Sequence, residues 1–161
     1  MGVAASAGPG SREVRRPSAP RAILGFWTAA CLGLLGCDPY SADKAELRPA
    51  DRARFERGAR AATPCWSCHD LVGDAIKVGP PLKGVFGRPA GDVKGFPYSP
   101  ALLKTEVVWN ARTMDAFLLN PQAIIPGNRM LSPPLRDIAR RSDLVFFLSV
   151  VTRPSRDPAA D

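Results

Sequence analysis

The chain has 161 residues, of which 45% are hydrophobic and 7% aromatic, and it carries 17 prolines, 14 glycines and a formal net charge of +7. This length suits one modest domain with additional segments. So much proline and glycine indicates a loop-rich domain that would gain stability from a cofactor, a metal or disulfides. The basic residues form no run interleaved with aromatic residues, which argues against a nucleic-acid-binding protein.

The first 37 residues have the pattern of an export signal. Arginines precede an uncharged run over residues 22–36, which is shorter than the about 20 residues of a membrane span but suits the apolar core of a signal peptide. The run leads into LLGC, residues 34–37, which resembles the lipobox of bacterial lipoproteins, whose cysteine is lipid-modified and becomes the new N-terminus. Cys37 is thus the expected lipid attachment site. An ordinary cleaved signal peptide and a short uncleaved anchor are the alternatives.

We expect four segments along the chain. They are a signal peptide with lipobox over residues 1–37, a polar tether over 38–49, a folded domain over 50–153 and a flexible tail over 154–161. Asp38, directly after the cysteine, resembles the signal that keeps some lipoproteins in the inner membrane. The expected location is the periplasmic side of the bacterial inner membrane, with the domain anchored by lipid.

The folded domain is expected to be all-α. Helices are expected near residues 50–62, 99–105, 112–119 and 142–152. Pro49 and Asp51 are start signals for the first of them, and Ser142 is a candidate cap for the last. The last helix would pack on the first through one apolar face, made of Leu144, Phe147 and Leu148.

The sequence CWSCH at residues 65–69 contains the single histidine of the chain. A Cys-x-x-Cys pair can be half of a zinc site, a redox dithiol or, when His follows at once, the attachment site of c-type haem. Zinc needs four ligands, and no second cysteine pair or second histidine follows, so a zinc site would have to be completed by a carboxylate in a crowded arrangement. A redox dithiol needs a βαβ context, and no alternating strand–helix pattern surrounds the motif. Haem needs only thioethers at Cys65 and Cys68, one helical turn apart, and His69 as the ligand of the iron. Haem c attachment is therefore the favoured interpretation.

With one histidine, the second axial ligand must be Met, Lys, water or nothing. Met114 lies in an expected amphipathic helix, where a methionine usually fills the core. Met130 lies in the irregular stretch IIPGNRML, where a loop can bring its sulfur to the iron. The sequence predicts that the metal ligands are His69 and Met130, with Met114 as the alternative to the latter.

Taken together, these motifs resemble the class I cytochromes c, close to the mitochondrial type, over roughly residues 54–151. The resemblance rests on CWSCH, GPPLKGVFGRPAG at 79–91, GFPYSPAL from Gly95, Trp109, FLLNP ending at Pro121, IPGNRM ending at Met130, and SDLVFFL at 142–148. It implies a class I cytochrome c fold over residues 50–153, with four to five short helices around one covalently bound haem c.

The resemblance also assigns roles to further residues. The carbonyl of Pro81 would accept the proton of the His69 ring and so orient the ligand. Arg88, Tyr98 and Trp109 would surround a buried haem propionate as hydrogen-bond donors, although Trp109 could instead be plain core. The remaining wall of the pocket would be apolar and includes Leu82, Phe86, Phe117 and Leu118.

Three departures from the family pattern carry expectations of their own. Phe117 stands where a tyrosine usually lies near the Met sulfur, and Leu102 stands where an asparagine often lies near the propionates. Both changes imply a drier haem pocket. Alanines and a proline, rather than an aromatic residue, precede CWSCH, which implies looser packing between the first and last helices.

The resemblance implies a monomeric electron carrier rather than an enzyme. Its partners would be other redox proteins: an oxidase, a peroxidase, a reaction centre or a cytochrome complex. Basic residues around the haem edge would guide docking, and the candidates are Lys77, Lys83, Lys104, Arg112 and Arg129. The alternative is a haem sensor or peroxidase-like protein whose sixth ligand is open or labile.

Overall fold

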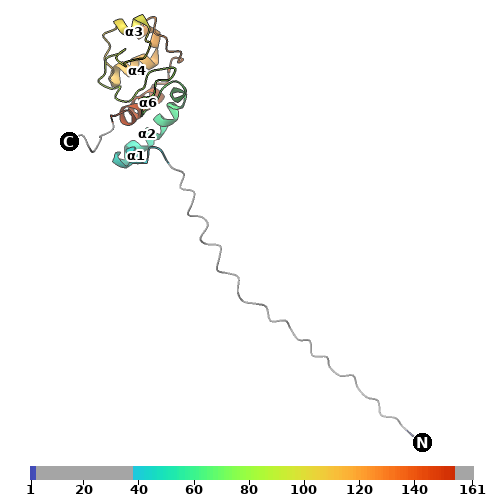
Figure 1. Cartoon of the computed structure of the whole chain (residues 1–161). Coiled ribbons are helices and arrows are strands. Elements are labelled where there is room, and N and C mark those ends of the chain that lie inside the picture. Colours follow the sequence, from blue (N-terminus) through green and yellow to red (C-terminus); the bar gives the residue numbers. More distant parts are fainter. Residues whose placement is uncertain (3–37, 155–161) are drawn as a thin grey trace, which may run out of the picture. The chain divides into compact units, whose positions relative to one another are not determined.

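The structure, a computed structural model, describes residues 1–2 and 38–154 (Figure 1). The chain divides into two units, residues 1–37 and 38–161. The expected signal peptide, the lipobox with Cys37 and nearly all of the expected tail lie outside the described residues. Within the described ranges, no helix is both long enough and apolar enough to cross a bilayer.

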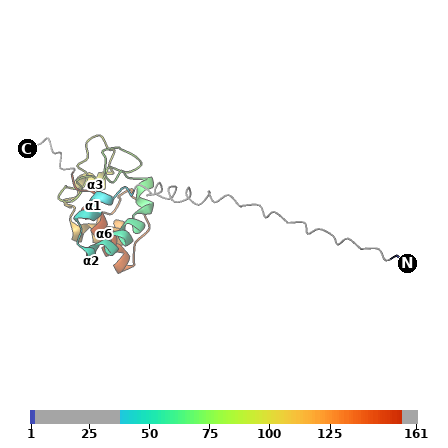
Figure 2. The same ribbon diagram turned by 90° about the horizontal axis from the view of Figure 1, so that it is seen from below.

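Helices account for the regular structure of residues 38–154. In chain order they are α1 (Ser41–Glu46), α2 (Pro49–Ala61), the 3-10 helix η1 (Thr63–Ser67), α3 (Pro100–Lys104), α4 (Ala111–Leu119), α5 (Pro121–Ile124) and α6 (Ile138–Val151). The β pairing in the described part of the chain is an isolated antiparallel bridge between Pro89 and Val108. This confirms the all-α fold, and long loops connect the helices (Figures 1 and 2).

The four expected helices are present as α2, α3, α4 and α6, but α6 begins earlier than expected. Its N-cap is Asp137, whose side chain accepts a hydrogen bond from the Arg140 amide at 2.9 Å. Ser142 lies inside the helix, and its hydroxyl accepts a hydrogen bond from Arg54 at 2.9 Å. The expectation that Ser142 caps this helix is therefore wrong. An aspartate is as good a cap as a serine, and the one upstream begins the helix.

Residues 38–49, expected as a polar tether, are folded onto the domain. The Tyr40 ring makes edge-on contacts with Phe55, Trp66 and Phe147, at centroid distances of 5.9, 5.9 and 5.3 Å. The Lys44 ammonium lies 2.8 Å from the Asp38 carboxylate, across α1. In this otherwise polar stretch, one aromatic side chain packs on the buried rings of Phe55 and Phe147 and on the exposed ring of Trp66. These residues therefore form a short helix and an aromatic contact with the domain, unlike the tether that was expected.

The core centres on the crossing of α2 and α6, which lie side by side in both views (Figures 1 and 2). Phe55 and Phe147 are 0% exposed, with ring centroids 5.0 Å apart. Gly58 allows the close approach: a Cβ there would fall 2.5 Å from the Phe147 Cβ and closer still to the Asp143 carbonyl oxygen. The expectation of loose packing between the first and last helices is therefore wrong. Although no aromatic residue directly precedes CWSCH, Gly58 lets the backbones of α2 and α6 come into close contact.

Gly58→Ala should destabilise the holoprotein by about 1–3 kcal/mol, because the added methyl group overpacks the helix crossing. At an exposed helix position, a glycine-to-alanine change would instead stabilise the protein by about 1 kcal/mol. The sign of the measured change therefore shows whether overpacking at the crossing dominates. Urea unfolding, followed by far-UV circular dichroism, measures the effect. Ala53→Gly, at an exposed position of α2, is the reverse control; an increase in stability from Gly58→Ala would contradict the close crossing.

Tyr40→Ala should lower the free energy of unfolding by about 2 kcal/mol, because three aromatic pairs are lost and each contributes about 0.5–1.5 kcal/mol. Tyr40→Phe keeps the ring and should stay close to the wild type. Both variants are compared by urea unfolding of the holoprotein. Equal stability of the two variants would mean that residues 38–49 are a loose tether after all.

Candidate functional site

The segment CWSCH begins inside η1, which starts shortly after the end of α2, and backbone hydrogen bonds wind it into a tight turn. The Cys65 amide donates to the Ala62 carbonyl at 2.8 Å, and the His69 amide donates to the Cys65 carbonyl at 2.8 Å. Cys65 is half-buried against the main core cluster, and both Cys65 and Cys68 are free thiols. The turn therefore presents two unpaired thiols and the histidine together, next to the core.

A hydrogen bond to a backbone carbonyl fixes the His69 ring. Its Nδ1 lies 2.7 Å from the carbonyl oxygen of Pro80. A carbonyl can only accept, so Nδ1 carries the proton and Nε2 keeps its lone pair for a metal. The expected partner, Pro81, is wrong by one residue: its carbonyl accepts instead from the Arg88 guanidinium at 2.9 Å. Either proline of GPP offers a suitable carbonyl, and only the path of the loop selects between them.

The protonation of this segment suits haem ligation better than thiol chemistry. Burial lowers the pKa of His69, against the raising effect of the hydrogen bond to Pro80, and the charge of Lys77 lowers it further. The ring is therefore held neutral, as a metal ligand must be. Burial also raises the pKa of the Cys65 thiol, whereas a redox dithiol needs a low one.

Gly79 forms the surface on which the His69 ring rests. A Cβ at this position would lie 2.7 Å from Nδ1 and 2.9 Å from Nε2 of the ring, so any larger residue would displace the ligand. The Gly79 amide also donates to the Cys68 carbonyl at 2.7 Å. The glycine and the proline after it thus set both the position and the rotation of the imidazole.

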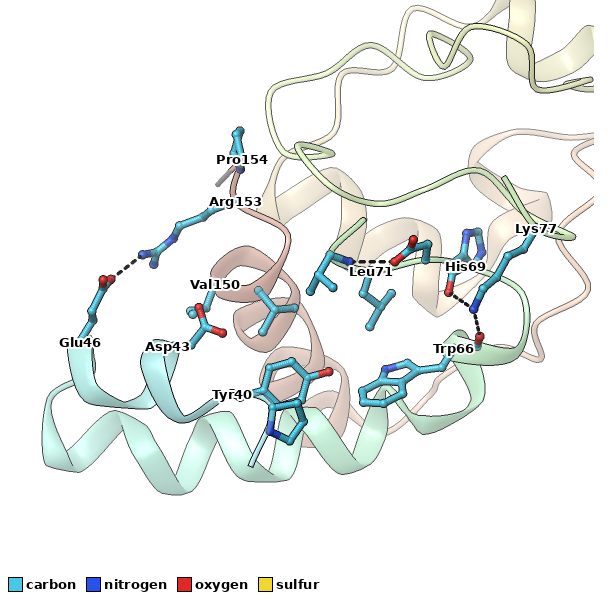
Figure 3. Close-up of a pocket in the computed structure, with 14 residues that line it drawn as sticks. Tyr40, Asp43, Glu46, Trp66, His69, Leu71, Lys77, Val150, Arg153 and Pro154 are labelled. Carbon is cyan, nitrogen blue, oxygen red and sulfur yellow. Dashed lines mark hydrogen bonds and ion pairs between the residues drawn. The ribbon is translucent and has the colours of Figure 1, made fainter. Parts of the chain in front are cut away.

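A groove of about 730 Å³ runs beside this segment, between the α1 region and the end of α6 (Figure 3). Tyr40 and Trp66 lie together in it, and the Lys77 ammonium donates to the Trp66 and His69 carbonyls at 2.8 and 3.3 Å. Lys77, which was expected to guide docking, thus also bonds two backbone carbonyls of the CWSCH turn. Two other candidates for docking also have partners: Lys83 pairs with Asp74 at 2.8 Å, and Arg129 donates to the Pro97 carbonyl.

Met130 lies in an apolar environment shared with two expected pocket residues. Phe117 belongs to a buried cluster against which Leu102, Trp109 and Met130 pack. The rings of Trp109 and Phe117 meet edge to face, with centroids 5.0 Å apart. Trp109 and Met130 also contact the main core cluster, which includes the buried Met114. Met114 is buried in the main cluster, and Met130 lies where the two clusters meet.

The residues expected around a propionate are held by the polypeptide itself. The Arg88 guanidinium donates to the Lys83 carbonyl at 3.0 Å as well as to Pro81. The Trp109 backbone pairs with that of Arg88 at 3.0 Å, which brings these two residues together. The Tyr98 ring packs on Phe96 at a centroid distance of 4.7 Å, and burial raises the pKa of its phenol.

Three residues of the site were missed from the sequence: Gly79, Pro80 and Asn128. The first two lie in GPPL, where the sequence predicted a turn but not which residue of the turn would contact His69. Asn128 is buried and accepts a hydrogen bond from the Met130 amide at 2.9 Å. The only signal in the sequence was its position, two residues before the expected ligand Met130; its burial could not be predicted.

The donor set fits haem c and not zinc. The CWSCH segment supplies two free thiols at Cys-x-x-Cys spacing and an imidazole whose Nδ1 is bonded to the Pro80 carbonyl, which leaves Nε2 for a metal. Across the part of the chain that the structure describes, no three His, Cys, Asp or Glu side chains come together as metal ligands. A four-ligand zinc site therefore has no ligand set there.

Known proteins share both sequence and fold with this chain. It is 38% identical over 102 residues to cytochrome c 2.1 of Caenorhabditis elegans, which covers 63% of the chain and 92% of that relative. It is 40% identical over 91 residues to cytochrome c of Sesamum indicum, covering 56% and 82%. The solved structure of cytochrome cH from Methylobacterium extorquens aligns with a TM-score of 0.56 at 32% identity, covering 59% of this chain and 96% of that one. No family model matches the chain.

The matches run across nearly the whole length of these relatives, so they concern the entire haem domain and not one motif. They agree with the helical architecture and with the spacing of Cys65 and Cys68. The protein carries one covalent haem c and is an electron carrier rather than an enzyme. From its sequence relatives, its structural neighbour and its own site, the chain belongs to the class I cytochrome c family.

Proposed function

We propose that this protein is a lipid-anchored monohaem cytochrome c on the periplasmic side of a bacterial inner membrane. It would pass single electrons between redox proteins, with its iron held by His69 and Met130. The observation that carries the ligand assignment is the 2.7 Å contact from His69 Nδ1 to the Pro80 carbonyl, which leaves Nε2 as a ready ligand.

Each residue of the site has a defined task in this proposal. When bound, the haem supplies the one-electron couple of its iron. Pro80 holds the proton on Nδ1 of His69 and raises the basicity of Nε2. Met130 completes the Met/His pair, which raises the reduction potential and suits a donor to an oxidase, a peroxidase or a reaction centre. Phe117 and Leu102 add no polar group to the pocket and so exclude water from it.

The proposed anchor rests on the sequence before the domain. LLGC at residues 34–37 resembles the lipobox, and Asp38 follows it. A lipidated cysteine carries two or three acyl chains, which hold stably where one would not. Two residues separate Cys37 from the docked Tyr40, so the reach between them is at most about 11 Å. The domain would therefore stay close to the bilayer, with partner encounters that are brief and dependent on salt.

The reduced protein should show a c-type optical spectrum that carbon monoxide does not change, because His69 and Met130 would both be ligands of the iron. Met130→Leu should allow carbon monoxide to bind, since leucine keeps the volume but removes the sulfur. Met114→Leu is the matched control and should behave as the wild type. Optical titration of the purified soluble domain measures all three.

Two results would contradict the ligand assignment. Binding of carbon monoxide to the wild type would favour the sensor or peroxidase-like function. Opening of the iron by Met114→Leu and not by Met130→Leu would move the ligand to α4.

Cys37→Ser should release the protein from the membrane fraction or leave an uncleaved precursor, because it removes the acceptor of the lipid. Cys31→Ser, in the same apolar run but outside the lipobox, should remain membrane-bound. Detergent-phase partitioning and the intact mass of full-length protein, matured in a bacterium, report on both variants. Equal behaviour of the two variants would favour an ordinary signal peptide or an uncleaved anchor.

A further inference from the structure

We propose that Asn128 is a positioning residue that fastens the loop carrying Met130, and thereby sets how readily the sixth position of the iron opens. This inference rests on the proposed ligation by Met130. Asn128 would act on the backbone of Met130 and not on its sulfur.

Both the nitrogen and the oxygen of the Asn128 side-chain amide are hydrogen-bonded within the protein. It is 5% exposed. Its Nδ2 donates to the carbonyls of Pro121 at 2.9 Å and Ile125 at 2.8 Å, and its Oδ1 accepts from the Met130 amide at 2.9 Å. One side chain therefore ties the start of α5, the residue after α5 and the backbone of Met130 together.

Gln122 braces the same turn from the other side. Its Nε2 donates to the Asn128 carbonyl at 2.9 Å, and its Oε1 accepts from the Gly127 amide at 3.1 Å. Gly127 has a φ of 85°, which a side chain would disfavour. The turn before Met130 is thus closed by side-chain amides rather than by regular secondary structure.

After Met130 the chain is held less tightly. Leu131 is 96% exposed, and the next fastening is at Leu135, whose amide donates to the Leu118 carbonyl of α4 at 2.9 Å. The Arg129 guanidinium reaches the Pro97 carbonyl, but this residue is exposed and water competes for the contact. Asn128 is therefore the nearest buried restraint on Met130.

Breaking this restraint has a cost that depends on burial. When the Met130 loop lifts, the contacts of the Asn128 amide are lost, and the carbonyls of Pro121 and Ile125 must find water or stay unsatisfied. An external ligand can bind the iron only while Met130 is away from it. Its apparent affinity is therefore its intrinsic affinity multiplied by the fraction of molecules in the open form.

The test is an imidazole titration of the ferric holoprotein, with the sulfur-to-iron charge-transfer band recorded in parallel. Asn128→Ala removes all three hydrogen bonds and should raise the apparent affinity for imidazole by about tenfold or more, with a weaker charge-transfer band. Asn128→Thr, whose hydroxyl can still accept from the Met130 amide, should give an intermediate value.

Asn120→Ala is the matched control. It also removes an asparagine side chain from this segment, where Asn120 accepts from the Ala123 amide at 3.2 Å and caps α5, but it makes no bond to Met130. It should lower stability slightly and leave the affinity for imidazole unchanged. If Asn120→Ala and Asn128→Ala raise the affinity equally, the effect is general loosening and the positioning role of Asn128 is refuted.

The outcomes separate this inference from the function on which it rests. A wild-type ferric protein without the charge-transfer band would show that Met130 is not a ligand and would overturn both. A wild type with the band, together with an Asn128→Ala variant of unchanged band and affinity, would overturn the role of Asn128 alone.

Discussion

The close crossing of α2 and α6 is the contact on which the rest of this cytochrome depends. Gly58 lets the two backbones approach until Phe55 and Phe147 are completely buried between them. The haem-attachment turn begins in η1, shortly after the end of α2, so the position of His69 depends on where this crossing holds α2. On the other side, α4 packs against α6 and leads into the loop of Met130. Both proposed iron ligands therefore take their positions from helices that pack on α6.

Away from that crossing, a few polar side chains hold the loops. Arg88 binds two carbonyls of residues 81–83, Asp70 accepts hydrogen bonds from the amides of Gly73 and Ala75, and Asn128 closes the turn before Met130. A chain with 17 prolines and 14 glycines cannot fasten such loops by helix or sheet bonds. Each of these side chains therefore fixes more backbone than an ordinary surface residue does, and the rigidity of the site is concentrated in few positions.

The sequence predicted those parts of the molecule whose signals are local. Helices α2, α3, α4 and α6 have caps or apolar faces within their own residues, and CWSCH identifies its chemistry by spacing alone. The rest depends on tertiary contacts. Helices α1 and α5, with 6 and 4 residues, are too short to show a period. The docking of Tyr40 is visible only when Phe147, over a hundred residues later, lies beside it. The choice of Pro80 over Pro81 depends on the path of a loop.

The docked Tyr40 also has a consequence for how partners are met. If Cys37 carries the proposed lipid, α1 would take up most of the segment between the lipid and the domain, and the domain would be unable to move far from the bilayer. Its search for partners would then be two-dimensional, by diffusion in the plane of the bilayer. The rate of electron delivery would then depend on the number of partners per area of membrane rather than on their concentration in solution. A soluble partner would have to reach the membrane surface to exchange electrons with this protein.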